Sequence, residues 1–208
     1  MTTLPHLSLS LMLLTTTAFL LAGLVKGVVG LGLPTLAMAL LALAMPPAQA
    51  AALLILPSVV TNVWQMRPWP TLAPMTRRLW PMQAGVVVGT LGGAWLLGAP
   101  AGAWAMQALG AALVVYGLWG LSGARVSQVP AGAERVLGPL VGAVTGLVTA
   151  ATGVFVIPAV PYLQALGLSR DELVQAMGLS FTVSTVALAA GLMLNGQCSA
   201  AALSGSAL

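Results

Sequence analysis

Few side chains in this sequence could carry out chemistry. It contains one histidine (His6), one cysteine (Cys198) and three acids (Glu134, Asp171 and Glu172). A metal site needs several such ligands together, and acid–base catalysis needs titratable groups that act as partners. A single cysteine also cannot form a disulfide within the chain. We therefore expect no enzyme active site, no metal and no cofactor.

Lys26 is the only charged residue between positions 1 and 66. A lysine inside a membrane costs several kcal/mol unless its ammonium group reaches the surface or finds a partner. The three acids are expected in loops or at the edge of a span and not inside one, so an anionic substrate would be a natural partner for Lys26. The alternative is a lysine at a helix end that extends to the lipid headgroups. The residues alone leave both roles open.

Two segments, 27–35 and 149–158, combine glycine, proline and threonine in a way that would interrupt a helix. A helix that restarts after a break presents free backbone N–H groups and the positive end of its dipole, which suits an anion. We expect the two breaks to meet and to bind substrate, although close helix packing through small residues is the alternative. The candidate residues are Gly27, Gly30, Gly32, Pro34, Thr35, Thr149, Thr152, Gly153 and Pro158.

Polar residues also lie within two alanine-rich segments, Asn62 in one and Ser180 and Ser184 in the other. They could donate hydrogen bonds to substrate or to a neighbouring helix, and both roles remain open. Glycine at every fourth position over 85–93 and 138–146, by contrast, is typical of close helix packing.

The composition defines the environment in which these residues act. Of 208 residues, only ten are charged and 59% are hydrophobic, and the mean hydropathy is +1.03. Charge-free runs over 27–66, 79–124 and 173–208 each exceed the roughly 20 residues that cross a bilayer once. The sequence therefore predicts an all-α, polytopic transmembrane bundle. It excludes a soluble enzyme, a nucleic-acid-binding domain, a disulfide scaffold and a disordered chain.

We expect about eight helical spans and a further apolar stretch from 199. The segments 33–45 and 155–168 are short, because they would reach only about 20 Å against a hydrocarbon core of roughly 30 Å. They are either tilted spans or half-helices that end inside the protein. The expected spans are about 9–25, 33–45, 48–66, 82–97, 103–121, 138–152, 155–168 and 172–194.

The basic residues predict the orientation. Five crossings separate the N-terminus from the loop 122–136. With the N-terminus outside, all seven basic residues fall on one face, which the positive-inside rule assigns to the cytoplasm. They are Lys26, Arg67, Arg77, Arg78, Arg125, Arg135 and Arg170.

The two halves of the chain are similar. GLVKG at 23–27 and GAVTG at 142–146 are each followed by small residues, a proline, a short apolar helix, a polar break and an alanine-rich helix. An odd number of crossings per unit makes the repeat inverted, as in many secondary transporters, whose broken helices bind substrate near the midplane. We assign 1–121 to the first repeat, 122–136 to a cytoplasmic connecting loop and 137–208 to a second, incomplete repeat.

The sequence GLVKGVVGLGLP at 23–34, with MPPAQA at 45–50 and LPSVVTNVWQ at 56–65, resembles the first repeat of the TauE/SafE sulfite exporter family. GAVTGLVTAATGVFVIP at 142–158 and GLSRDEL at 167–173 resemble its second repeat. The resemblance covers nearly the whole chain. It implies a multi-pass permease of the bacterial inner membrane that moves sulfite, organosulfonates or related sulfur and carboxylate anions.

We therefore expect a permease that exports small anions by alternating access between the repeats, with the lipid bilayer as its environment and no nucleic-acid partner. The substrate class follows from the resemblance, whereas the anion-capable helix breaks follow from the residues. A channel-like passive pore and an accessory or scaffold membrane protein remain as alternatives.

Overall fold

The computed structural model describes residues 9–100, 102–123, 127–130 and 132–196, and within these ranges its regular structure is entirely helical. Five of the helices, α1, α3, α5, α6 and α8, are long and apolar enough to cross a membrane. The prediction of an all-α membrane bundle is confirmed. His6, Cys198, Arg125 and the apolar stretch from 199 lie outside the described residues. The elements are α1 (Leu9–Val29), α2 (Leu33–Leu41), α3 (Pro47–Gln65), the 3₁₀ turn η1 (Trp69–Thr71), α4 (Leu72–Leu97), α5 (Gly102–Ser122), α6 (Glu134–Thr152), α7 (Ala159–Gln164) and α8 (Arg170–Leu194).

The two short segments are shorter than expected. With nine residues in α2 and six in α7, they rise only about 14 and 9 Å along their axes. These lengths agree with half-helices and not with tilted spans.

Prolines inside the long helices do not end them. α4 begins at Leu72, ten residues before the expected start at 82, and continues through Pro81. α3 likewise continues through Pro57. Long helices packed in a bundle tolerate proline because local adjustment and neighbouring groups satisfy the freed carbonyl.

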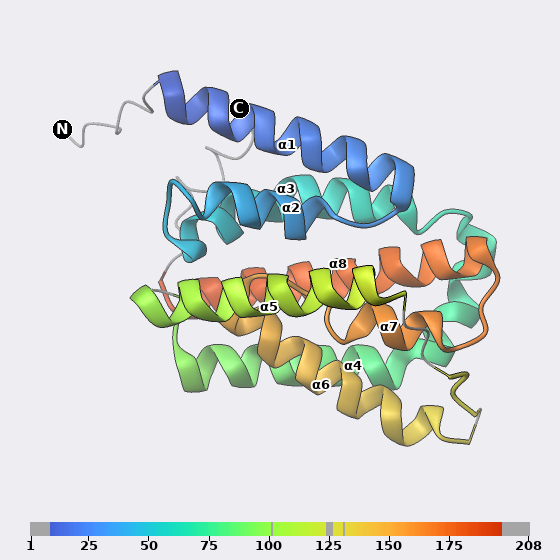
Figure 1. Ribbon diagram of the computed structural model, residues 1–208. Helices are drawn as coiled ribbons and strands as arrows, with labels where there is room; N and C mark the ends of the chain where they lie inside the picture. The colour runs from blue at the N-terminus through green and yellow to red at the C-terminus, as the bar shows by residue number, and fades with distance from the viewer. Residues whose placement is uncertain (1–8, 101, 124–126, 131, 197–208) are drawn as a thin grey trace.

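Contacts between helices establish their directions. α1 runs parallel to α3, because Lys26 meets Asn62 and Gly30 meets Gln65 further along both helices. α8 runs antiparallel to α3, because the later residue Gln65 bonds to Val174 and the earlier Asn62 bonds to Thr185 further along α8. The chain therefore passes in one direction through α1 and α3 and in the other through α8 (Figure 1).

The directions of α4 and α6 follow from the same kind of contact. α4 runs parallel to α8, with Gln83 bonded to Ser180 and Ala94 bonded to Asn195. α6 runs parallel to α4, because successive glycines of α4 meet successive turns of α6. α1 and α3 thus run opposite to α6 and α8. These directions agree with an inverted arrangement of the two halves, which stays a prediction.

These directions bring the basic residues to one end of the bundle. The end of α1, the α3–α4 connection and the starts of α4, α6 and α8 all lie there (Figure 1). Of the seven basic residues, the six that the structure describes lie at or near this basic end: Lys26, Arg67, Arg77, Arg78, Arg135 and Arg170.

The glycine runs form a close contact between α4 and α6. A Cβ atom on Gly89 of α4 would lie 2.8 Å from the Cα of Ala143 in α6. One on Gly142 of α6 would lie 2.9 Å from the backbone nitrogen of Val86. The prediction that these glycines allow close packing is confirmed.

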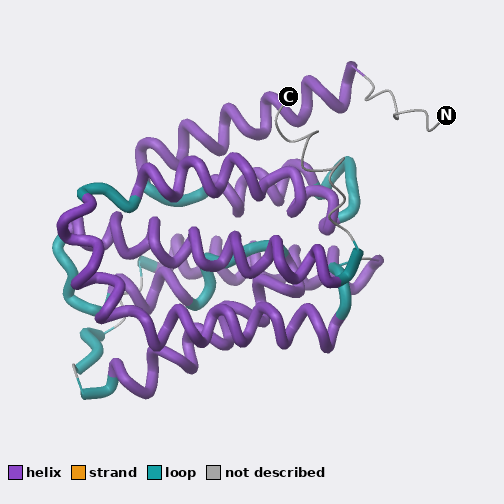
Figure 2. The backbone as a smooth tube through the Cα atoms, turned by 180° about the vertical axis from the view of Figure 1, so that it is seen from behind, coloured by secondary structure: helices purple, strands orange, loops and turns teal. Residues whose placement is uncertain are grey.

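The two central helices of the bundle are α3 and α8. In the most apolar stretch of each helix, 61% of the residues are buried in α8 and 50% in α3, against 17% in α1 and 11% in α5. Opposite views place α1 along one edge and the α4–α6 pair along the other (Figure 2). Several of the polar side chains that reach the interior lie on these two helices, among them Asn62 on α3 and Thr185 on α8.

Candidate functional site

Lys26 lies near the end of α1 and points into the bundle. Its side chain is only 7% exposed. The ammonium group donates to the Oγ1 of Thr61 at 3.0 Å and to the Oδ1 of Asn62, both on α3. The alternative in which Lys26 extends to the headgroups is therefore wrong for this structure. The charge instead has neutral oxygen acceptors on the central helix.

Asn62 connects this lysine to the second half of the chain. Its side chain is completely buried, and its amide nitrogen donates to the Oγ1 of Thr185 on α8 at 3.4 Å. Thr185 in turn donates to the carbonyl of Phe181 at 2.7 Å. A chain of polar contacts thus joins α1, α3 and α8 through the centre of the bundle.

A cavity of about 590 Å³ opens beside Lys26. We call it the Lys26 pocket. Two of its lining residues, Lys26 and Arg170, are basic, and none of the described residues that line it is an acid. The pocket therefore carries net positive charge and has room for a small hydrated anion. Its lining residues are Gly23, Lys26, Gly27, Val28, Val29, Gly30, Val60, Thr61, Trp64, Gln65, Arg170 and Val174.

Gln65 fixes the wall of the pocket at the first helix break. Its amide nitrogen donates to the carbonyl of Gly30 at 3.0 Å and to that of Val174 at 3.2 Å. Gly30 follows the last residue of α1 with a φ of 76°, a backbone conformation that residues other than glycine rarely adopt. Gln65 thereby ties the end of α1 to the first turns of α8.

Two buried polar atoms near the pocket have no hydrogen-bond partner in the described chain, the Oγ of Ser58 and the Oε1 of Gln65. Ser58 lies one turn before Asn62 on α3 and so shares its face. Buried polar groups without partners are uncommon in folded proteins. This face of α3 therefore retains hydrogen-bonding capacity that a ligand or a water molecule could use.

The second break lies elsewhere. Gly153 ends α6 with its Cα facing Met38 and Ala51, where a Cβ would approach within 3.1 and 3.2 Å. Gly30, in contrast, lies beside Gln65. Because 14 residues of α3 separate Ala51 from Gln65, the two breaks are about 21 Å apart along that helix. The expectation that they meet is wrong here, because antiparallel helices place their ends at opposite sides.

The threonine hydroxyl groups of the second break donate to backbone carbonyls of α6 itself. Thr149 donates to the carbonyl of Thr145 at 2.7 Å, and Thr152 donates to that of Val148 at 2.6 Å. Pro158 follows in the connection to α7. None of these residues lines the Lys26 pocket.

The start of α2 is also separate from the pocket. Gly32 precedes the helix with a φ of 110°, Pro34 lies in its first turn, and the hydroxyl of Thr35 donates to the carbonyl of Gly32 at 3.1 Å. The three residues do not line the Lys26 pocket. Of the candidate site residues in the first break, only Gly27 and Gly30 line the Lys26 pocket.

Ser180 and Ser184 are buried on α8. Ser180 accepts a hydrogen bond at 2.8 Å from the amide nitrogen of Gln83 on α4.

Sequence reasoning did not select Gln83, Ser58 or Arg170 as site residues. A polar residue within an otherwise apolar helix was the signal for Gln83 and Ser58, whereas the place of Arg170 beside Lys26 depends on tertiary packing.

A family model described as sulfite exporter TauE/SafE matches residues 15–208. The chain belongs to this family. The resemblance seen in the sequence is thereby confirmed, and the match includes every candidate site residue. Family membership makes the protein a multi-pass membrane transporter, with sulfur-containing anions as substrates at the level of the family. No curated protein and no solved structure matches the chain.

Proposed function

We propose that this protein is a secondary permease that exports sulfite or a related small organosulfur or carboxylate anion, and that the Lys26 pocket binds the anion. The observation that carries the proposal is the buried ammonium of Lys26, whose partners among the described residues are all neutral oxygens. Burying an unpaired charge costs several kcal/mol. An anion in the pocket would offset this cost and is the partner that the charge lacks.

The pocket supports a small anion by more than one group. Arg170 contributes a second positive charge on the pocket lining. Ser58 lies outside the lining, deeper along α3, and has a buried hydroxyl without a partner in the described chain. Positive charge together with neutral donors can bind an oxyanion without a metal or a catalytic group. We accordingly propose transport without chemical conversion of the substrate.

The arrangement supports alternating access. The pocket lies at the basic end, whereas toward the other end the core is packed closely, with Met38 against Gly153. Phe155 and Phe181 pack against each other inside the core, with ring centroids 5.2 Å apart. An anion that binds Lys26 competes with Thr61 and Asn62 for its ammonium group. Binding would therefore weaken the attachment of α1 to α3 and favour a second conformation.

We further propose that the protein lies in the bacterial inner membrane with its N-terminus outside and its arginine-rich loops in the cytoplasm. The six basic residues at one end of the described bundle support this orientation through the positive-inside rule. In that orientation the Lys26 pocket opens near the cytoplasm, as an exporter requires for loading. The segments 1–121 and 137–208 would then be the two inverted units.

Uptake into proteoliposomes tests the proposal. We expect radiolabelled sulfite, or one of a panel of sulfonates and carboxylates, to enter protein-containing vesicles faster than empty ones. Unlabelled substrate trapped inside should accelerate the uptake of label. Uptake of no panel member above empty vesicles would refute the permease, and uptake without saturation or counterflow would indicate a passive pore.

A further inference from the structure

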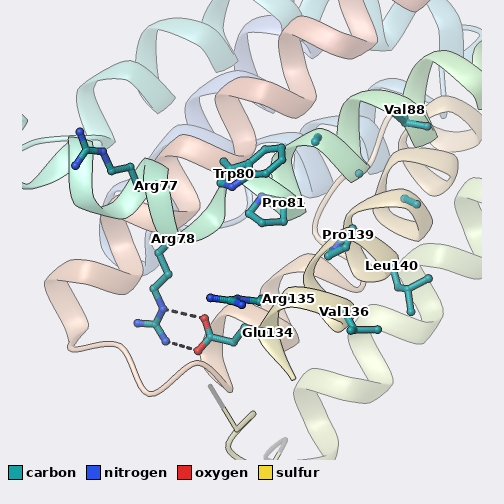
Figure 3. A pocket seen from close by; sticks show the side chains of 13 residues that line it. Arg77, Arg78, Trp80, Pro81, Val88, Glu134, Arg135, Val136, Pro139 and Leu140 are labelled. Carbon is teal, nitrogen blue, oxygen red and sulfur yellow. Dashed lines mark hydrogen bonds and ion pairs between the residues drawn. The ribbon is translucent and has the colours of Figure 1, made fainter. Parts of the chain in front are cut away.

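A second cavity, of about 1100 Å³, lies between α4 and α6 at the basic end of the bundle. It is far from the Lys26 pocket in sequence and shares no lining residue with it. We call it the α4–α6 groove (Figure 3). Its lining residues are Arg77, Arg78, Trp80, Pro81, Ala84, Gly85, Val88, Glu134, Arg135, Val136, Pro139, Leu140 and Ala143.

The charged end of the groove has three arginines and one carboxylate, so its net charge is positive. Arg78 forms two hydrogen bonds with the carboxylate of Glu134, at 2.9 and 2.7 Å, and a third with the carbonyl of Leu166 at 3.0 Å. Figure 3 shows this pair with Arg135 beside it. Arg77 and Arg135 have no carboxylate partner in the described chain. Two positive charges therefore remain on the two walls of the groove.

The rest of the groove is apolar and open. Val88 of α4 is 69% exposed and Leu140 of α6 is 58% exposed, and Gly85 and Ala143 form the close contact beneath them. Because Val88 follows Arg77 by 11 residues, the apolar wall extends about 16 Å from the charged end. Trp80, also exposed, lies between the two zones, as tryptophans do at membrane interfaces.

We infer that the α4–α6 groove binds one anionic phospholipid, with its phosphate near Arg135 and the first part of an acyl chain along Val88 and Leu140. Arg77, on the other wall, adds positive charge at the same end of the groove, although its side chain points away from Arg135 (Figure 3). Basic pockets between membrane helices suit anionic headgroups. A soluble phosphate would use the charged end but would leave the adjoining apolar wall uncovered. The separation of charge and apolar surface along one groove matches the separation within a phospholipid.

Lipid titration of the purified full chain in neutral detergent tests this inference. The probes are dioleoylphosphatidylglycerol, dioleoylphosphatidylcholine and inorganic phosphate, and the readouts are lipid retention in native mass spectrometry and the melting temperature. The variants are Arg135→Gln, Arg77→Gln and the double variant. Arg67→Gln is the matched control, because Arg67 lies at the same basic end but stacks on Trp64, outside the groove.

We expect phosphatidylglycerol to bind and to raise the melting temperature more than phosphatidylcholine does. Each single variant should weaken that binding about fivefold and the double variant about thirtyfold, because a basic residue near the surface contributes about 1 kcal/mol. Arg67→Gln should bind like the wild type. Equal binding of both lipids, unchanged binding by the double variant, or an equal effect of inorganic phosphate would overturn the inference. The melting temperature of the double variant in phosphatidylcholine alone shows that it is folded.

Discussion

At the scale of single residues, the proposed anion binding depends on which groups pair with the ammonium of Lys26. Lys26 is buried, and its partners Thr61 and Asn62 are uncharged. A lysine with a purely structural role in a membrane would be expected to pair with an acid or to reach the surface. The acids Glu134, Asp171 and Glu172 begin other helices, at α6 and α8. The ammonium is therefore available to an anion that enters the pocket.

Asn62→Asp should reduce transport, because the new carboxylate would pair with Lys26. The new carboxylate would lie where the Oδ1 of Asn62 now accepts from Lys26, so an internal ion pair would replace the substrate anion. We expect sulfite uptake to fall about tenfold or more, since hydrogen bonds to charged groups contribute about 1.5–3 kcal/mol. Uptake by proteoliposomes measures this, with Asn62→Ser as the neutral control. Unchanged uptake by Asn62→Asp would argue against Lys26 as the anion ligand.

Arg170→Gln should have a smaller effect that depends on salt. Arg170 lines the Lys26 pocket but is exposed, so its attraction for an anion is screened by solvent and ions. We expect the KM for sulfite to rise up to about fivefold at low ionic strength and to approach the wild-type value near 1 M salt. Initial rates at several salt concentrations check this. A KM shift that is the same at every salt concentration would contradict an electrostatic role.

The sequence predicted Lys26 because it is the sole charge in a long apolar stretch, and Asn62 because an amide lies in an alanine-rich helix. It could not predict that the two bond to each other. That contact arises because α1 and α3 run parallel and their later ends come together, which depends on the short return through α2. The place of Arg170 in the same pocket depends likewise on the antiparallel packing of α8 against α3.

At the scale of helices, small residues decide which elements can approach. Gly89 faces the backbone of Ala143, whereas a Cβ atom on Gly92, three residues later in α4, would meet no neighbouring atom within 4 Å. The two glycines share a helix and differ only in their surroundings. They therefore form a matched pair for testing the contact between α4 and α6.

Gly89→Ala should destabilise the protein by about 1–3 kcal/mol, because the added methyl group forces apart two tightly packed backbones. Gly92→Ala should be neutral or stabilise by up to about 1 kcal/mol, because alanine favours a helix over glycine. Thermal unfolding in detergent compares the two variants. Equal stabilities would show that the α4–α6 contact is looser than described.

The sequence predicted where along the chain the helices are interrupted, but not how far apart the two interruptions lie in space. Glycine and proline at 27–35 and 149–158 predicted interruptions, and α1 ends at Val29 and α6 at Thr152. The breaks do not meet, because α1 and α6 run in opposite directions. The span expected from 82 begins at Leu72 in the structure, because α4 continues through Pro81.

At the scale of the whole molecule, composition and charge predicted the most. Ten charges in 208 residues predicted a membrane bundle, and the basic residues were expected on one face. The described bundle gathers six of them at one end. The lengths of α2 and α7 were overestimated, because apolar residues continue into the connection after α2 and into the connections on both sides of α7.

Site-directed labelling tests the orientation. In a Cys198→Ala background, Gln128→Cys lies in the α5–α6 connection at the basic end, and Leu43→Cys lies in the exposed α2–α3 connection at the other end. We expect an impermeant maleimide to label position 43 in intact cells and position 128 only after permeabilisation. The reverse pattern would overturn the proposed orientation.

The measurement that tests the central claim most directly is sulfite transport by Lys26→Met in proteoliposomes, at wild-type protein density. Methionine keeps the length and apolar stem of the side chain and removes its charge. Since replacing a buried charge by an apolar group of similar volume is often neutral or stabilising, we expect a melting temperature at or above that of the wild type. We predict sulfite uptake at least about tenfold slower than the wild type. Folded Lys26→Met protein that transports sulfite at the wild-type rate would contradict the account.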